Sequence, residues 1–250
     1  PLPLYVGKSN NLRDRVASHF SSDYRSATDL RLSAEITRIE FERTAGELGA
    51  LLRESLLVKR LMPAHNIALR RKAESAVLDL GDGSGPPRLV AVADADPREL
   101  CGCYGPWVSR RVALEALRGL AAEHRLCLSI LGLEKRTGAC FARQLGRCEG
   151  ACAGIESRAD HHARVKAALA PQVIPPWPYT GLATIRERAP DGERTDVHVI
   201  DRWCWLGTAR DDEELGRLVE EPPRPEFDPD IARLLIRSFR RGELDLRPVR

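Results

Sequence analysis

The first twenty residues place a short apolar segment directly ahead of a helix that carries basic side chains. Leu4-Tyr5-Val6 is typical of a strand. Asn10 or Asn11 can cap the helix that follows, on which Arg15 and His19 lie one turn apart. Because only a few residues join the two elements, we expect the tyrosine, the arginine and the histidine to lie close together.

A second predicted strand and a longer helix follow. Alternating apolar residues predict the strand over 36–42. Apolar residues at helical spacing predict a helix from Glu47 to Leu61, which Pro63 ends. These elements predict a compact α/β domain over residues 1–72, with a small central sheet flanked by helices.

The rest of the chain is predicted to form an α+β accessory region. Two hairpins are predicted, one over 77–80 and 89–93 and one over 182–187 and 196–200. Helices are predicted over 110–124, 157–169 and 229–241. The predicted order is the α/β domain at 1–72, a hairpin and helix region at 73–126, a cysteine cluster with its helix at 127–170, and a C-terminal α+β region at 171–250.

Charge is distributed unevenly along the chain. Residues 1–72 hold 13 Lys and Arg against 8 Asp and Glu, whereas the remaining residues hold 26 against 28. A basic first domain fits a polyanionic partner such as nucleic acid. No apolar run reaches the roughly 18 residues of a transmembrane helix. The odd number of cysteines, seven in all, disfavours a disulfide framework. We therefore expect a cytoplasmic protein that does not bind a membrane.

The polar side chains of the first domain suit the cutting of a phosphodiester by water. That reaction needs an activated nucleophile, stabilisation of charge on the phosphate and help for the leaving oxygen. Glu54 is a plausible ligand for Mg²⁺, which proteins often hold with one or two carboxylates. Arg15 offers a charged fork that suits phosphate, and Tyr5 can orient or deprotonate a water. Each residue alone more often packs a core or faces solvent, so only the combination favours a nuclease.

The full pattern over residues 1–72 resembles the GIY-YIG nuclease superfamily and, within it, the UvrC group of excision-repair endonucleases. The matching motifs are Leu4-Tyr5-Val6-Gly7-Lys8-Ser9-x-Asn11-Leu12-x-x-Arg15-Val16-x-x-His19-Phe20, Gly46-Glu47-Leu48-Gly49-Ala50-Leu51-Leu52-x-Glu54 and Pro63-x-x-Asn66. By this resemblance Tyr5 belongs to the second signature triplet and acts as base or water-orienting group, with Lys8 supporting it. Arg15 is the catalytic arginine, and His19 helps around the phosphate.

The resemblance also implies a metal ligand, a supporting residue and a DNA-binding surface. Glu54 would hold Mg²⁺ or Mn²⁺, and Asn66 would support the conformation of the site. The basic residues expected to contact DNA are Lys8, Arg13, Arg70, Arg71 and Lys72.

Motifs beyond residue 72 resemble Cho, the short branch of the UvrC group. They are Gly132-Leu133-Glu134, Gly146-Arg147-Cys148-x-Gly150-Ala151-Cys152 and Trp203-x-Trp205-Leu206-Gly207. The resemblance implies incision of damaged duplex DNA on the 3′ side of a lesion that UvrA and UvrB hand over, within nucleotide excision repair and the SOS response.

The start of the chain bears on whether this site is complete. The first signature triplet of the family lies upstream of its tyrosine, and only four residues precede Tyr5. The single methionine is Met62, so Pro1 is not expected to be a natural start. We therefore expect part of a longer chain, and some relatives carry a DnaQ-type exonuclease domain ahead of the Cho-like part. The alternative to an active enzyme is a non-catalytic module that binds damaged DNA or recruits partners, with an incomplete nuclease site.

Four cysteines fall within 26 residues in the spacing C-x12-C-x7-C-x3-C, namely Cys127, Cys140, Cys148 and Cys152. Zinc sites more often contain two close pairs, and here only the last two cysteines form one. Uneven spacing suits an iron–sulfur cluster at least as well. Reduced cysteines that pack as small apolar side chains are the third interpretation. UvrC proteins have a similarly spaced cluster described as a [4Fe–4S] centre, so the resemblance favours iron–sulfur over zinc. We interpret His161-His162 on the following helix as a solvated pair.

Overall fold

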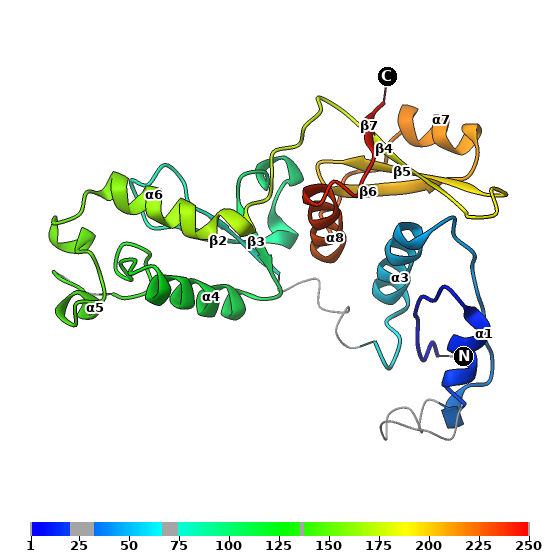
Figure 1. Ribbon diagram of the computed structural model, residues 1–250, viewed down its shortest axis with the longest axis horizontal. Coiled ribbons are helices and arrows are strands. Elements are labelled where there is room, and N and C mark those ends of the chain that lie inside the picture. Colours follow the sequence, from blue (N-terminus) through cyan, green and yellow to red (C-terminus); the bar gives the residue numbers. More distant parts are fainter. Residues whose placement is uncertain (1, 21–32, 67–74, 136–137, 250) are drawn as a thin grey trace. The chain divides into compact units, whose positions relative to one another are not determined.

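The computed structural model describes residues 2–20, 33–66, 75–135 and 138–249. The chain forms two compact units (Figure 1). Unit 1 combines Pro1–Lys72 with Tyr179–Arg250, and unit 2 is Ala73–Pro178. Unit 1 is therefore assembled from both ends of the chain. Among the described helices, none is both long enough and apolar enough to cross a membrane.

Unit 2 is built on a three-stranded antiparallel sheet in the order β2-β1-β3. Its strands are β1 (Ala76–Asp79), β2 (Arg88–Ala91) and β3 (Tyr104–Trp107). The neighbours Val77 and Leu78 of β1 are both buried. Because consecutive strand residues point to opposite faces, both faces of the central strand are covered. Short 3-10 helices at Val92–Asp94 and Pro97–Glu99 connect β2 to β3.

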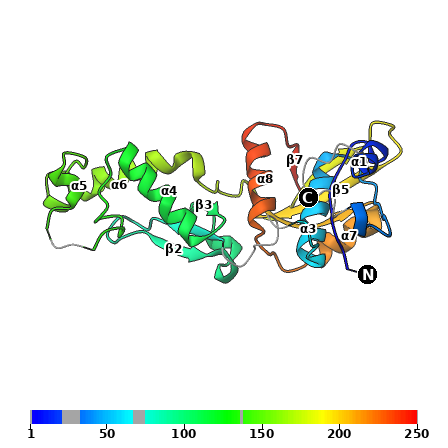
Figure 2. The ribbon, with the colours of Figure 1, turned by 90° about the horizontal axis from the view of Figure 1, so that it is seen from below.

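Helices α4 (Arg110–Glu123) and α6 (Arg158–Leu169) pack against this sheet. Each begins after a serine, Ser109 or Ser157, whose hydroxyl accepts an N–H bond from the first turn. The segment between them contains α5 (Phe141–Gln144) and a 3-10 helix at Ala151–Ala153, and another 3-10 turn, Ala170–Gln172, follows α6. Figures 1 and 2 place α5 at the end of unit 2 away from β3.

Unit 1 contains a four-stranded antiparallel sheet in the order β6-β5-β4-β7. Its strands are β4 (Ala183–Arg188), β5 (Thr195–Asp201), β6 (Cys204–Ala209) and β7 (Leu246–Pro248). The chain turns between β5 and β6 at Arg202 and Trp203, whose φ values are 47° and 65°. Two consecutive positive φ values are typical of a tight two-residue hairpin. The two predicted hairpins are confirmed elsewhere, because β1 pairs antiparallel with β2 and β4 pairs antiparallel with β5.

Unit 1 also contains the helices α1 (Leu12–Ser18), α3 (Glu47–Leu61), α7 (Asp212–Glu220) and α8 (Pro229–Arg240), of which α7 and α8 contact strands of this sheet. The helix predicted over 47–61 is confirmed at both ends. It buries Leu48, Leu52 and Val58, which are among the residues whose spacing predicted it. Helix α3 also contacts α8, and the two lie side by side in both views (Figures 1 and 2).

The mixed helix and sheet content predicted for the chain is confirmed, and both sheets are antiparallel. The two strands predicted at 4–6 and 36–42 are wrong, because no strand occurs in the described parts of 2–66. The sheet of unit 1 comes from residues 183–248 instead.

Hydrogen bonding and exposure explain why these two segments are not strands. The carbonyl groups of Pro3 and Leu4 accept N–H bonds of 3.1 and 2.9 Å from Ala64 and His65. The first segment therefore pairs with the loop after α3 rather than with a strand. In the second segment Phe41 is 76% exposed, so its alternating apolar pattern does not correspond to a buried face.

Candidate functional site

Three of the predicted catalytic side chains lie together at the start of unit 1. The Arg15 guanidinium donates a hydrogen bond from Nη2 to the Tyr5 hydroxyl, with an N···O distance of 2.5 Å. Its central carbon lies 5.6 Å from the centre of the Tyr5 ring. The His19 ring meets the same tyrosine edge-on, with 5.3 Å between ring centres. Helix α1 produces this arrangement, because residues four apart lie on one face of a helix.

Glu54 of α3 belongs to the same group of side chains. Burial raises the pKa of its carboxyl, and the positive charges of Lys8 and Arg15 oppose that rise. The carboxylate is therefore half-buried within the electrostatic reach of two cations. The structure thus brings Tyr5, Arg15 and Glu54 to one site, although they come from three different segments.

Lys8 has a partner that the sequence did not identify. Its Nζ donates a 2.7 Å hydrogen bond to Oε1 of Glu47. Glu47 and Glu54 are seven residues apart, which places them on the same face of α3. That spacing was the available signal for Glu47. The Lys8–Glu47 pair connects the loop after Tyr5 to the first turn of α3.

Asn66 holds the backbone beside Tyr5. Its side-chain oxygen accepts a 2.9 Å bond from the Val6 N–H, and its side-chain nitrogen donates a 2.7 Å bond to the Val6 carbonyl. A side-chain amide can replace a neighbouring strand in this way, because it offers one acceptor and two donors. Asn66 therefore fixes the backbone next to Tyr5 and does not itself touch the Tyr5–Arg15 pair in any hydrogen bond among the described residues.

Only two of the five predicted DNA-binding residues lie in the part of the chain that the structure describes. Lys8 is at the site, and Arg13 is exposed on α1. The basic run Arg70, Arg71 and Lys72 lies outside the described residues. Among the described residues, Lys8 and Arg15 are the charged groups that act on the Glu54 carboxyl.

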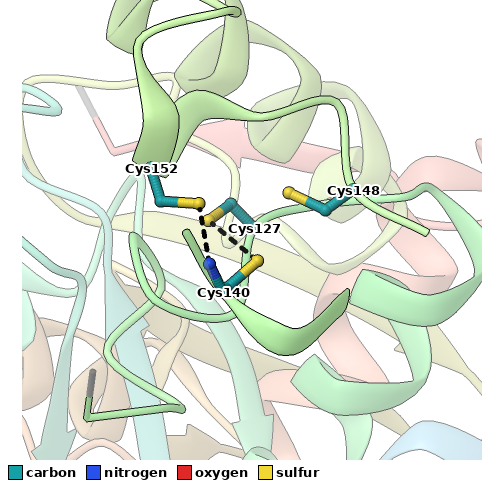
Figure 3. Close-up of side chains that lie close together, drawn as sticks. All are labelled: Cys127, Cys140, Cys148 and Cys152. Carbon is teal, nitrogen blue, oxygen red and sulfur yellow. Dashed lines mark hydrogen bonds between the residues drawn. The ribbon is translucent and has the colours of Figure 1, made fainter. Parts of the chain in front are cut away.

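The four clustered cysteines converge in unit 2 (Figure 3). Their sulfur atoms all lie within 4.8 Å of one another. The Sγ atoms of Cys127 and Cys140 are 3.9 Å apart. Three of the four side chains are buried, and Cys152 is partly exposed. No ordinary apolar packing requires four sulfurs to face a common point, so this donor set fits a thiophilic metal.

Backbone N–H groups and burial set the chemistry of these thiols. Burial raises the pKa of Cys127 and Cys148, and it raises that of Cys140 to about 11. Burial also opposes ionisation of Cys152, but hydrogen bonds from the Cys140 N–H and neighbouring thiols lower its pKa overall. Metal binding would therefore release protons from the buried thiols, since thiolates are the ligands.

The interpretation of His161 as solvated is wrong. It is 1% exposed, and its Nε2 accepts a 2.9 Å bond from the Cys127 N–H. Burial lowers the pKa of His161, which favours the neutral ring that this acceptor role requires. His161, Val165 and Leu169 are spaced four residues apart and are all buried. That helical spacing was the available signal that His161 lies on the inner face of α6.

The surroundings of Glu54 fit a hard divalent cation. Mg²⁺ commonly takes one or two protein carboxylates and fills its other positions with water and phosphate oxygens. Glu54 supplies one half-buried carboxylate of this kind. Lys8 and Arg15 beside it supply positive charge for a phosphate group.

Comparison with known proteins gives three family matches that together cover most of the chain. A UvrC-like GIY-YIG domain matches residues 2–67, the middle domain of UvrC/Cho excinucleases matches 77–171, and the excinuclease Cho C-terminal domain matches 182–250. Excinuclease cho of Shigella flexneri is 36% identical over 247 residues, which is 98% of this chain and 80% of the relative. Excinuclease cho of Escherichia coli strain K12 has the same identity and coverage. UvrABC system protein C of Dechloromonas aromatica is 30% identical over 66% of this chain and 27% of its own length. No solved structure matches.

Proposed function

The chain belongs to the Cho excinuclease family, and we propose that it is a metal-dependent endonuclease that nicks damaged duplex DNA on the 3′ side of a lesion. The observation that supports a catalytic rather than a binding role is that Arg15 both binds the Tyr5 hydroxyl and acts electrostatically on the half-buried Glu54 carboxylate. A surface used only to bind DNA would need basic side chains but no tyrosine beside a half-buried carboxylate.

The reaction joins a water oxygen to phosphorus and breaks the bond from phosphorus to one sugar oxygen. In the proposed mechanism Tyr5 orients the water and relays its proton to the solvent, while Arg15 holds the tyrosine oxygen in place. The departing sugar oxygen takes up a proton from the solvent. The same guanidinium and His19 stabilise negative charge that develops on the phosphate. Glu54 would hold Mg²⁺ or Mn²⁺, which supplies stabilisation of phosphate charge and of the leaving oxygen when it is bound.

Lys8 and Asn66 have supporting roles in this proposal. Lys8 is bound to α3 through Glu47, and we propose that this keeps its positive charge near the phosphate. Lys8 makes no hydrogen bond to Tyr5 among the described residues. Asn66 keeps the Val6 backbone in the conformation that directs Tyr5 toward Arg15. Arg13 is proposed to contact the DNA backbone, as are Arg70, Arg71 and Lys72 of the segment outside the described residues.

The cellular setting is proposed from the family. Damaged duplex DNA is the substrate, and UvrB, loaded by UvrA, is the proposed partner in the cytoplasm. A DnaQ-type exonuclease domain ahead of residue 1 stays a prediction.

We further propose that Cys127, Cys140, Cys148 and Cys152 hold one metal centre through four thiolates. A single tetrahedral ion with metal–sulfur bonds of about 2.3 Å places its sulfurs about 3.8 Å apart. The 3.9 Å between Cys127 and Cys140 is close to that spacing and favours one ion. The family resemblance favours a [4Fe–4S] cluster, whose thiolates are attached to four separate irons and so lie farther apart. Metal and sulfide analysis of protein purified without oxygen distinguishes the two, because only the cluster contains acid-labile sulfide.

The direct test of the nuclease is Glu54→Ala on lesion-bearing duplex, with UvrA, UvrB and Mn²⁺ present. We expect nicking to fall by at least about 1,000-fold, because the metal loses its carboxylate. DNA binding, measured by fluorescence anisotropy, should change little. Glu213→Ala, an exposed carboxylate on α7, is the matched control. Equal nicking by Glu54→Ala and the parent would refute the proposed site. A parent protein that binds the duplex tightly but never nicks it would instead favour the recruitment module.

A further inference from the structure

The first turn of α3 lacks a cap from its own sequence. Its N-cap residue is Gly46, which has no side chain to accept an N–H bond. The first N–H groups of any helix have no partner within the helix, and leaving them without one costs stability. In most helices a serine, threonine or aspartate at the N-cap solves this problem.

A carboxylate from the far end of the chain supplies the missing cap. Oε1 of Glu187, on β4, accepts a 2.8 Å bond from the Leu48 N–H. Oε2 of the same carboxylate accepts a 2.6 Å bond from the Gly49 N–H. The negative charge also lies at the positive end of the helix dipole, where it is favourable. Glu187 thus binds α3 through two charge-assisted hydrogen bonds.

The two glycines of this turn make the approach possible. A Cβ atom on Gly46 would lie 2.5 Å from Glu187 Oε1, and a Cβ atom on Gly49 would lie 3.1 Å from Glu187 Oε2. The first distance is far inside van der Waals contact, so a larger residue at 46 would push the carboxylate away. The local sequence and the distant carboxylate are therefore matched.

Glu187 is itself held in place by a histidine of the neighbouring strand. Nε2 of His198, on the neighbouring strand β5, lies 3.1 Å from Glu187 Oε2, and Nδ1 lies 2.8 Å from the Thr208 hydroxyl on β6. His198 is fully buried. Burial opposes ionisation of Glu187, but its hydrogen bonds to His198, Gly49 and Leu48 outweigh that effect and lower its pKa. Three strands of the sheet thus fix the direction of this carboxylate.

The last turns of α3 are attached to the same part of the chain. Nζ of Lys59 donates bonds of 2.5 Å to Asp228 and 2.9 Å to Asp230, at the start of α8. The Lys59 side chain is only 12% exposed, so water competes weakly for these bonds. Glu54 lies on α3 between this attachment and the one at Glu187.

We propose that Glu187 is a positioning residue of the nuclease, which fixes the start of α3 and thereby places Glu54 opposite Tyr5 and Arg15. The C-terminal sheet of unit 1 would then act as the support of the metal-binding helix. This inference rests on the proposed role of Glu54 as the metal ligand. It assigns Glu187 no contact with DNA, metal or water.

The test compares Glu187→Ala and Glu187→Gln with the parent and with Glu213→Gln, an exposed carboxylate on α7. Amide hydrogen exchange of residues 47–54 reads the helix start directly. Mn²⁺ binding to the full chain, followed by electron paramagnetic resonance, reads the placement of Glu54 without any reaction. Nicking over a range of Mn²⁺ concentrations separates metal affinity from turnover. Circular dichroism establishes that each variant is folded.

In Glu187→Ala we expect the Leu48 and Gly49 amides to exchange at least about tenfold faster, because both lose a charged acceptor. We expect Mn²⁺ to bind about tenfold more weakly, and nicking at low Mn²⁺ to fall 10- to 100-fold, since small misplacements of catalytic groups have effects of that size. High Mn²⁺ should restore most of the lost rate. Glu187→Gln keeps one acceptor and should lie between Ala and the parent.

Unchanged amide exchange in folded Glu187→Ala would overturn the cap. Faster exchange with unchanged Mn²⁺ binding would overturn the positioning role, because α3 would then be loosened without moving Glu54. Failure of the proposed function is recognised separately: Glu54→Ala would then bind Mn²⁺ and nick as the parent does.

Discussion

The proposed nuclease site of unit 1 and the four-cysteine cluster of unit 2 are built in opposite ways. The side chains of the proposed nuclease site are half-buried or exposed, with Arg15 exposed, and they come from three segments within residues 5–54. The four cysteines come from 26 residues, and three of them are buried. An exposed site can admit DNA, and we propose that this one depends on support from a distant residue, Glu187, which binds the start of α3. Buried ligands are poorly placed to meet a substrate, so the metal centre proposed for these cysteines would contribute to the stability of the fold.

The largest effect that separates the two sites is expected for Cys140→Ser. The loss of one thiolate should remove the metal and destabilise unit 2 by about 3 kcal/mol or more, because metal binding and folding are coupled in such sites. Elemental analysis and thermal unfolding followed by circular dichroism measure the two effects. Amide exchange of α3 in unit 1 should stay as in the parent.

Cys101→Ser is the control, since this cysteine is partly exposed and lies outside the four-cysteine group. Retention of the metal by Cys140→Ser, with an unchanged unfolding curve, would contradict the structural role. Faster amide exchange in α3 would contradict the expectation that the stability of unit 1 does not depend on the cysteine cluster.

A smaller effect, confined to unit 1, is expected for Arg15→Lys. Lysine keeps the positive charge but loses the planar fork that holds the Tyr5 hydroxyl and can bind phosphate. We expect about a 100-fold loss of nicking, the size seen when one donor to a reacting oxygen is removed. The rate is measured at saturating DNA and Mn²⁺, so that weaker binding does not contribute.

Arg38→Lys is the matched control, because Arg38 is exposed and pairs only with the equally exposed Glu40 among the described residues. A loss of nicking as large in Arg38→Lys as in Arg15→Lys would indicate an effect of arginine content rather than of the site. Cys140→Ser, assayed at low temperature, should not show the loss of nicking that is expected for Arg15→Lys.

The parts of the fold that could be predicted from sequence are those that depend on neighbouring residues. Helix α3 was predicted to the residue because its apolar spacing and Pro63 act within one segment. The cysteines were grouped for the same reason, and the structure brings their sulfurs together. Strands β3, β6 and β7 and helices α5 and α7 were not predicted. The strands β3 and β7 are short, and all three strands gain stability from partners elsewhere in the chain.

The residues of the candidate site could be predicted from the sequence, but the residue that caps helix α3 could not. Tyr5, Arg15 and Glu54 could be named from their spacing, and they do lie together. The cap on α3 joins Gly49 to a residue 138 positions away, and no local pattern marks such a pairing. The missing N-cap side chain at Gly46 was the one local sign that α3 needed help from another segment.

The smallest expected effect concerns Glu54, whose carboxylate is proposed to serve activity while it lowers the stability of the metal-free protein. Its folded-state pKa is raised above the ordinary value of 4.5, chiefly by burial. A raised pKa means that its stabilising contribution is complete below pH 4.5 and is lost as the pH rises through the folded value. Above that value the charged, half-buried carboxylate destabilises the protein. Glu54→Gln removes this charge, so in the presence of a chelator it should be more stable than the parent at pH 7.

The gain should be a few tenths of a kcal/mol, because solvent reaches the half-buried side chain and screens it. It should disappear below pH 4.5, where the parent carboxyl is protonated as well. Thermal unfolding between pH 4 and pH 8 measures the difference. Added Mn²⁺ should reverse its sign, since a metal that binds only the folded parent stabilises the parent alone. If Glu54→Gln is less stable than the parent in chelator at pH 7, then attraction to Lys8 and Arg15 outweighs burial, and the carboxylate stabilises unit 1 instead of being held in place by it.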